Sequence, residues 1–206
     1  MLKQWLSEST VSNLDKFISE FESAKPFNYI CIDNFLNENK FLELKKACVI
    51  QEFYVEDHDL YHFFRTIDYK NSKVPIIVEF REFLKSSEFR TFFEKLVSMG
   101  LDSKKMDLHS LRLENGDYLL CHDDDVQDRA IAFILNLSEF EEIDGGKLEL
   151  FESENGKPTK ICKSIVPKAN RFNMFKVTPG KSFHQIEEVM SEKQRNSISG
   201  WYYKND

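Results

Sequence analysis

Three side chains of the sequence are of the types that hold a divalent metal ion. His122 and Asp124 are separated by one residue, so on an extended strand both side chains would point to the same face. Two histidines and one carboxylate form the ligand set of iron(II) sites that keep positions open for oxygen. The second histidine must come from elsewhere in the chain, and His184 is the candidate. We therefore expect His122, Asp124 and His184 to be metal ligands at the centre of a catalytic site.

Each of these side chains, taken alone, has an ordinary structural explanation. The run Asp123–Asp125 is typical of a solvated acidic turn, and His184 could be a buried core histidine. Cys121 would point to the opposite face of a strand from His122 and is set aside as a ligand. Arg195, which follows His184 by eleven residues, would by itself most often be a surface charge. The metal-site hypothesis depends on the joint order of these residues.

That order, and the sequences around it, resemble the iron(II)- and 2-oxoglutarate-dependent oxygenases of the prolyl-hydroxylase branch. The resemblance is greatest to the catalytic domain of the ribosomal-protein prolyl hydroxylases, and it extends over most of the chain, from Tyr29 to Tyr202. It implies that the fold contains a double-stranded β-helix (jelly roll). The segments that carry it are Ile32–Leu36, Asp59–Phe63, Arg129–Leu135, Asp144–Leu150, Ser164–Pro167 and Ser182–Gln185.

The resemblance also implies a set of cofactors and of contacts to them. Iron(II) would be held by His122, Asp124 and His184, with 2-oxoglutarate and O2 as co-substrates and ascorbate as an optional reductant. Arg195 would bind the distal carboxylate of 2-oxoglutarate, because a carboxylate buried without a partner is costly and a guanidinium offers it two parallel donors. Ser197 would add a hydroxyl from the same strand face.

Two tyrosines that hold the keto acid in the family have no counterpart here. The neighbourhood of the first reads Leu111-Arg112-Leu113, and Asn136 stands in place of the second. Asn136 can still donate a hydrogen bond, and Tyr118 can compensate for a missing tyrosine. We therefore expect Asn136 and Tyr118 to be cofactor contacts as well.

The expected function is hydroxylation of an unactivated C–H bond, with succinate and CO2 as co-products. By resemblance, the leading substrate is a prolyl residue of a protein or peptide. A free amino acid or small metabolite of a biosynthetic pathway is the alternative within the enzymes, and a non-catalytic metal-binding sensor module is the alternative of another class. The ribosomal hydroxylases have a second, non-catalytic β-helix domain after the catalytic one. This sequence ends after the first, which leaves open whether a ribosomal protein is the substrate.

The elements that must position these residues are indicated by the hydrophobic pattern. Apolar residues at helical spacing predict a helix over 12–24, another after Asn37, and further helices over 75–99. The rest of the chain, after Gly100, alternates as short strands broken by turn residues. We expect an α+β fold in one domain, 1–206, with 1–100 mainly helical support that buttresses one sheet and 101–206 the β-helix core. Substrate recognition is expected from two loops, 52–73 and 125–129.

Composition bounds the class of protein. With 206 residues, 41% hydrophobic and 14% aromatic content, the chain can form one packed core. Its net charge of −7 disfavours a nucleic-acid partner and provides no basic membrane patch, but an acidic surface would attract a basic substrate. No segment predicts a membrane span or signal peptide, and the four scattered cysteines favour reduced thiols in a cytoplasmic protein. The oligomeric state is not indicated by the sequence.

Overall fold

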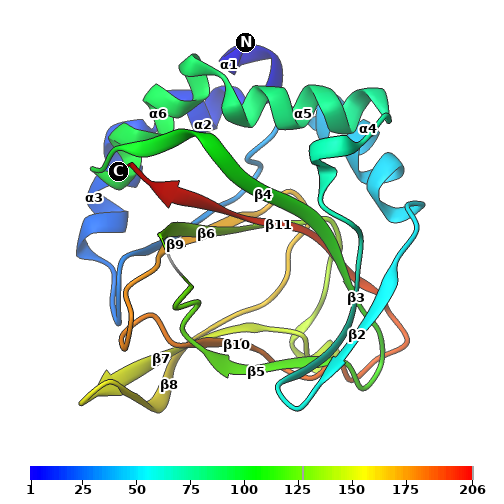
Figure 1. Ribbon diagram of the computed structural model, residues 1–206, viewed down its shortest axis with the longest axis vertical. Helices are drawn as coiled ribbons and strands as arrows, with labels where there is room; N and C mark the ends of the chain where they lie inside the picture. The colour runs from blue at the N-terminus through cyan, green and yellow to red at the C-terminus, as the bar shows by residue number, and fades with distance from the viewer. Residues whose placement is uncertain (127, 206) are drawn as a thin grey trace.

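The computed structural model describes residues 1–126 and 128–205. Gln127, in the expected recognition loop, and Asp206 lie outside the described residues. Within the described ranges, eleven strands form one antiparallel sheet that curls into two facing layers (Figure 1). The strands are β1 (Tyr29–Ile32), β2 (Tyr54–His58), β3 (Tyr61–Arg65), β4 (Leu101–Leu113), β5 (Tyr118–His122), β6 (Arg129–Asn136), β7 (Leu148–Glu154), β8 (Lys157–Ile165), β9 (Phe172–Lys176), β10 (His184–Ile186) and β11 (Arg195–Lys204).

The order of the strands explains how the two layers arise. One layer runs β1-β9-β6-β11-β4, and the other runs β5-β10-β7-β8. Strand β3 joins them, because it pairs with β4 through Phe64 and Arg65 and with β5 through Tyr61 and His62. Strand β2 pairs with β3. The last strand, β11, therefore lies in the interior of the sheet between β4 and β6.

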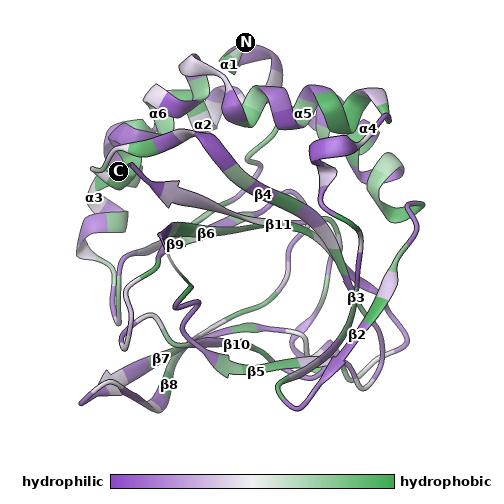
Figure 2. Ribbon diagram, in the orientation of Figure 1, coloured by the Kyte–Doolittle hydropathy of each residue, from purple (hydrophilic) through white to green (hydrophobic). Residues whose placement is uncertain are grey.

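The helices cover the outer face of the first layer, above the sheet in Figure 1. They are α1 (Leu2–Trp5), α2 (Glu8–Ser12), α3 (Leu14–Ser23), α4 (Glu38–Val49), α5 (Pro75–Lys85) and α6 (Ser87–Val97), with short 3-10 turns η1 (Tyr69–Asn71) and η2 (Glu142–Asp144). Hydrophobic and hydrophilic residues alternate in bands along α5 in Figure 2, as an amphipathic helix requires. No helix of residues 1–126 and 128–205 is both long and apolar enough to cross a bilayer.

Phenylalanine side chains fill the space between the helices and the first layer. Phe93 of α6 packs against Tyr202 of β11 with ring centroids 4.9 Å apart, and Phe133 of β6 stacks on Phe172 of β9 at 5.5 Å. All four rings are buried. Full burial of such a ring is worth about 2–3 kcal/mol, so this cluster fixes the helices on the sheet. The opposite face of this layer lines a cavity.

The structure confirms the α+β class and the helices that buttress one sheet. Helices α3 to α6 lie where the hydrophobic spacing indicated them, although α6 ends at Val97 and Ser98 takes the left-handed conformation (φ 51°) instead of Gly100 ending the helix. One feature differs from expectation, because the chain after Gly100 begins with a strand of 13 residues rather than a short one. The first hundred residues are mainly helical and also contribute three strands, so the sheet is built from both halves of the sequence.

Candidate metal centre

The two histidines and the aspartate meet in space. His122 at the end of β5 and His184 at the start of β10 are paired across the sheet, and their ring centroids are 4.2 Å apart. Asp124 lies between them, with its Oδ1 3.7 Å from Nε2 of His122 and its Oδ2 3.6 Å from Nε2 of His184. One ligand atom from each residue lies within 4.8 Å of the other two. Donor atoms this close can bind a single divalent ion.

Asp124 reaches this position through the loop after β5, and not through strand alternation as expected. Strand β5 ends at His122, so Asp124 does not share a strand face with it. Asp124 adopts a positive φ of 61° in the loop that follows, a conformation that aspartate tolerates better than most residues. The expected grouping is present, but a left-handed backbone turn produces it and strand alternation does not.

Backbone carbonyls orient both imidazole rings. Nδ1 of His122 is 2.8 Å from the carbonyl oxygen of Leu120, and Nδ1 of His184 is 2.9 Å from that of Ser182. A carbonyl can only accept, so each Nδ1 carries the proton and each Nε2 presents its lone pair to a metal. Burial and the neighbouring His122 lower the pKa of His184 to about 4. His184 is therefore neutral at physiological pH, which is the form that binds metal.

Two further side chains hold the carboxylate of Asp124. Nη1 of Arg129 donates to Oδ1 at 3.2 Å, and Nε1 of Trp201 donates to Oδ2 at 3.0 Å. The Arg129 guanidinium also lies over the Trp201 ring, 3.7 Å from its centroid. Neither residue was identified from the sequence. The alternation that places Arg195 and Ser197 on one face of β11 also predicts Trp201 there, whereas Arg129 could be found only from the fold.

Arg195 is a buried cation without a counter-ion in the described part of the chain. The residue is 1% exposed, and its Nε donates to the carbonyl oxygen of Gly146 at 2.7 Å. Gly146 has a φ of +64°, and a Cβ there would lie 3.0 Å from Cδ of Arg195. Glycine thus allows the backbone to approach the guanidinium. Burial lowers the pKa of Arg195 to about 10, so it remains charged at neutral pH, and it lines the cavity that contains the metal-binding group.

Polar atoms without partners lie next to Arg195. Ser197 and Ser199 follow it on the same face of β11, and Asn136 of β6 is the direct cross-strand partner of Ser197. Within the described residues, Oγ of both serines and Oδ1 of Asn136 are buried and have no hydrogen-bond partner. A buried charge and several unsatisfied polar atoms are costly unless a ligand completes them. Arg195 and Ser199 line the cavity, whereas Ser197 and Asn136 are not among its lining residues. The end of the cavity at Arg195 fits the carboxylate of a bound organic acid.

Tyr118 is not brought to this group. Its neighbour Leu119 lines the cavity, as does Tyr61, the cross-strand partner of Leu119. Adjacent strand residues face opposite sides of a sheet, so Tyr118 faces away from the cavity, like its own partner His62. The compensation expected from Tyr118 is not made in the structure.

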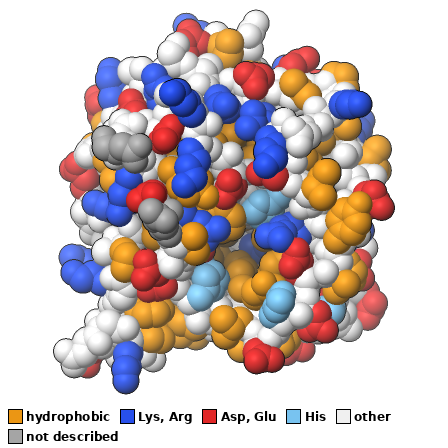
Figure 3. Space-filling model, viewed as in Figure 1, with side chains coloured by type: hydrophobic (Ala, Val, Ile, Leu, Met, Phe, Trp, Pro, Cys, Tyr) orange, Lys and Arg blue, Asp and Glu red, His pale blue; other side chains and the backbone are white. Residues whose placement is uncertain are grey.

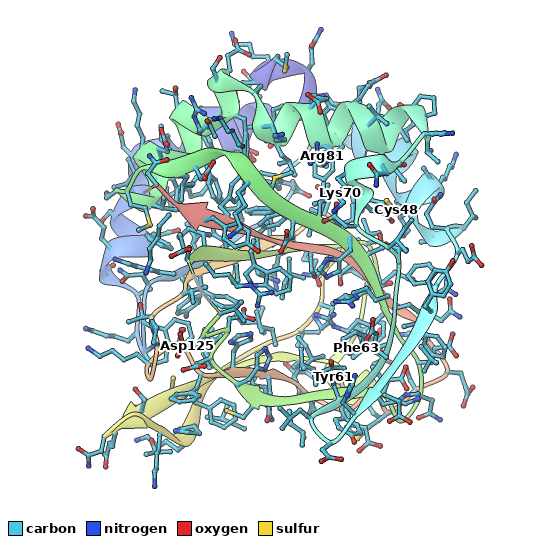
Figure 4. All side chains as sticks on the ribbon, in the orientation of Figure 1. Cys48, Tyr61, Phe63, Lys70, Arg81 and Asp125 are labelled. Atoms are coloured by element: carbon cyan, nitrogen blue, oxygen red, sulfur yellow. The ribbon has the colours of Figure 1, made fainter. Side chains whose placement is uncertain are left out.

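The cavity has a volume of about 370 Å³ and opens between the two layers (Figure 3). Its walls are mainly apolar, and Tyr61 and Phe63 of β3, both labelled in Figure 4, line it. Both expected recognition segments contribute to it, with Tyr61, Phe63 and Arg65 from the first, and Val126 and Arg129 from the second. A chamber of this size holds a small organic acid together with one side chain of a larger molecule.

His109 of β4 lies at the inner wall of the cavity and was also missed by the sequence analysis. It is 6% exposed, and its ring lies 5.5 Å from that of Trp201. Burial, together with the positive charges of Arg65 and Arg129, lowers the pKa of His109 to about 3. The imidazole is therefore neutral at working pH and adds a polar but uncharged group to the chamber.

Comparisons with known proteins agree with this geometry. The sequence profile of the 2OG-Fe(II) oxygenase superfamily matches residues 108–203. Prolyl 3-hydroxylase OGFOD1 of Mus musculus is 40% identical over 182 residues, which is 86% of this chain and 33% of that protein. Prolyl 3,4-dihydroxylase OGFOD1 of Ostreococcus tauri is 33% identical over 201 residues, 89% of this chain and 39% of that protein. The chain thus spans little more than a third of the length of these relatives.

Solved structures show the same fold. A prolyl-4-hydroxylase of Pseudomonas putida superposes with a TM-score of 0.73 at 17% identity, over 94% of this chain and 100% of that one. A prolyl hydroxylase of Trichoplax adhaerens, in complex with a peptide fragment of the hypoxia inducible factor oxygen degradation domain, gives a TM-score of 0.68 at 14% identity, over 96% and 91% of the two chains. The double-stranded β-helix expected from the sequence is therefore confirmed.

Proposed function

The chain carries a domain of the 2OG-Fe(II) oxygenase superfamily, and from that premise we propose that it hydroxylates a prolyl residue of a protein or peptide. The observation that supports this most directly is the pairing of two features in one cavity. His122, Asp124 and His184 face the same space as the buried guanidinium of Arg195, which has no counter-ion among the described residues. A metal site beside a carboxylate-binding site is what an oxygenase that consumes a keto acid requires.

Each residue of the site has a role in this proposal. His122, Asp124 and His184 hold iron(II), and Arg195, Ser197 and Asn136 hold the distal carboxylate of 2-oxoglutarate. Bound iron and 2-oxoglutarate would supply the oxidising power that inserts oxygen into a C–H bond and releases succinate and CO2. The protein orients the keto acid through Arg195 and keeps water out with the apolar walls of the cavity. Ascorbate would serve only to keep the iron reduced.

The shape of the chamber supports a prolyl substrate. Tyr61 and Phe63 stack with ring centroids 4.8 Å apart and form one wall, and Trp201 forms part of another. Flat aromatic faces suit an apolar ring such as that of proline, and the relatives above are named as prolyl hydroxylases. We propose a single oxygenase domain over 1–206 that acts on a polypeptide in the cytoplasm, where the four free thiols would stay reduced.

The test begins without oxygen. The protein, iron(II) and 2-oxoglutarate are mixed anaerobically, and we expect the weak visible absorption of an iron–keto acid chelate. Air is then admitted with a panel of proline-containing peptides and, separately, free amino acids. Mass spectrometry is expected to find one added oxygen on a prolyl residue, with matching succinate. Oxygen gained only by free amino acids would refute the polypeptide substrate, and the absence of both chelate and succinate would leave a binding module.

A further inference from the structure

We propose that the free edge of β2 is a docking strand for a basic, extended segment of the polypeptide substrate. The inference rests on the proposed function, because it assigns where that polypeptide binds outside the catalytic cavity. Within the described residues β2 has one neighbour, β3, so its other edge presents backbone donors and acceptors to solvent. An exposed edge of this kind can accept an added strand.

The other two ends of the sheet are protected in ways that β2 is not. Helix α3 packs beside β1, at one end. Strand β8, at the other end, carries Pro158 and three lysines, Lys157, Lys160 and Lys163. Lysine and proline are the usual residues that prevent an edge strand from pairing. Strand β2 reads Tyr-Val-Glu-Asp-His and has neither. Of these three strands, β8 carries residues that hinder pairing, β1 has a helix packed against it, and β2 has neither feature.

The charge of this edge selects its partner. The segment 52–64 contains four acidic residues, Glu52, Glu56, Asp57 and Asp59, and no lysine or arginine. Glu56 is paired with Arg65 across the hairpin, while Glu52, Asp57 and Asp59 form no salt bridge to a described residue. Two such edges would repel each other, so a second copy of this chain is disfavoured. A strand that carries lysine or arginine is the complement.

Apolar side chains on the same hairpin add contact area for an extended segment. Val55 is 57% exposed and Leu60 is 52% exposed, although both are large hydrophobic residues. In Figure 3, acidic, hydrophobic and histidine side chains gather beside the hollow, on the side where Figure 1 shows β2 and β3. Alternating apolar and basic residues in the partner would match this mixed surface.

The edge is continuous with the catalytic cavity. The register pairs His58 of β2 with Tyr61, and their rings are 4.9 Å apart. Tyr61 in turn stacks on Phe63, and both line the cavity, as does Leu60 in the hairpin turn. A polypeptide paired along β2 could therefore continue over the hairpin to the cavity. The added strand would lie about 4.8 Å from β2, outside the cavity. The docking segment would therefore be separated from the hydroxylated residue by several residues of the same polypeptide.

The experiment uses two labelled peptides of equal length, one alternating lysine with valine and the other glutamate with valine. Fluorescence anisotropy measures their binding to the whole protein, loaded anaerobically with iron(II) and 2-oxoglutarate. We expect the lysine peptide to bind at least about tenfold more tightly than the glutamate peptide at low salt, with the difference shrinking as salt screens the charges. Equal binding of the two peptides, or no binding of either, overturns the docking strand.

Charge reversal locates the site. In the double variant Glu52→Lys, Asp57→Lys the preference for the lysine peptide should fall by about tenfold or invert. The matched control, Glu8→Lys with Asp15→Lys, reverses two exposed acidic residues of α2 and α3 and should retain the preference. An equal loss in both variants would mean that only the overall net charge attracts the peptide, and would overturn the proposal. The visible absorption of the same samples reports the iron–keto acid chelate, so a failure of the proposed oxygenase function is scored separately.

Discussion

Replacing Arg195 by methionine should separate what the buried charge costs the fold from what it contributes to binding. Methionine keeps an apolar stem of similar length and removes the guanidinium. Burial lowers the pKa of Arg195 to about 10, well below the ordinary range of arginine, and each pH unit corresponds to about 1.4 kcal/mol. Holding this charge in the metal-free protein therefore costs roughly 3 kcal/mol. The cost is present in full at neutral pH and is relieved only as the pH rises through 10.

The substitution also removes one favourable contact. Nε of Arg195 donates to the carbonyl oxygen of Gly146 at 2.7 Å, and such a bond contributes about 1 kcal/mol. The balance predicts that Arg195→Met raises the free energy of unfolding of the ligand-free protein by about 2 kcal/mol. Binding of 2-oxoglutarate should suffer the opposite effect. Its carboxylate would be buried without a cation, at a cost of about 3–5 kcal/mol, or a hundredfold to several thousandfold in Kd.

Urea unfolding of the metal-free protein and calorimetric titration of 2-oxoglutarate into anaerobic, manganese-loaded protein measure the two effects. Arg171→Met is the matched control, because Nη2 of Arg171 donates to Oδ2 of Asp33 at 3.1 Å. Loss of that paired arginine should destabilise the protein and leave the affinity for 2-oxoglutarate unchanged. The reasoning is refuted if Arg195→Met destabilises the ligand-free protein and 2-oxoglutarate still binds with an affinity within threefold of the original.

Three further predictions concern the metal centre and the cavity wall. Asp124→Ala should abolish both iron binding and succinate formation; turnover that persists would place the metal elsewhere. Trp201→Phe keeps an aromatic ring beside Arg129 but removes the donor to Oδ2 of Asp124, and should weaken manganese binding about tenfold to a hundredfold by electron paramagnetic resonance. His109, with its pKa lowered to about 3 from an ordinary value of 6.5, should make the free energy of unfolding fall by about 1.4 kcal/mol per pH unit as the pH drops from 6.5 to about 3. His109→Leu should make the measured slope shallower by that amount, and an unchanged slope would contradict the burial argument.

The principal residues of the candidate site could be predicted from the sequence because their types and order are restrictive. His122, Asp124 and His184, followed by Arg195, stand in an order that resembles a known family, and strand alternation then places Ser197 on the same face as Arg195. The path of the backbone could not be predicted in the same way. Asp124 reaches the metal-binding group through a left-handed residue, and strand periodicity contains no information on such a turn.

Other features depend on pairings between distant parts of the chain. His109 faces Ser199 only because β4 and β11 pair in one particular register, and local patterns do not encode that register. Arg129 contacts Asp124 through a loop whose course depends on the surrounding sheet. The face on which Tyr118 lies follows from the register of β5 against β3. The positions of His109, Arg129 and Tyr118 therefore depend on tertiary pairing, which the sequence pattern alone does not predict.

The interior position of β11 has a consequence for how the protein matures. Strands β4 and β6 are each hydrogen-bonded to β11 along most of its length, yet during synthesis both leave the ribosome before it does. Until β11 arrives, the two strands expose open edges, which are prone to pair wrongly or with other nascent chains. The same strand delivers Arg195 and Trp201. A chain released before β11 would lack both its central strand and its organic-acid pocket, so an assay of ligand binding would also report whether folding had finished.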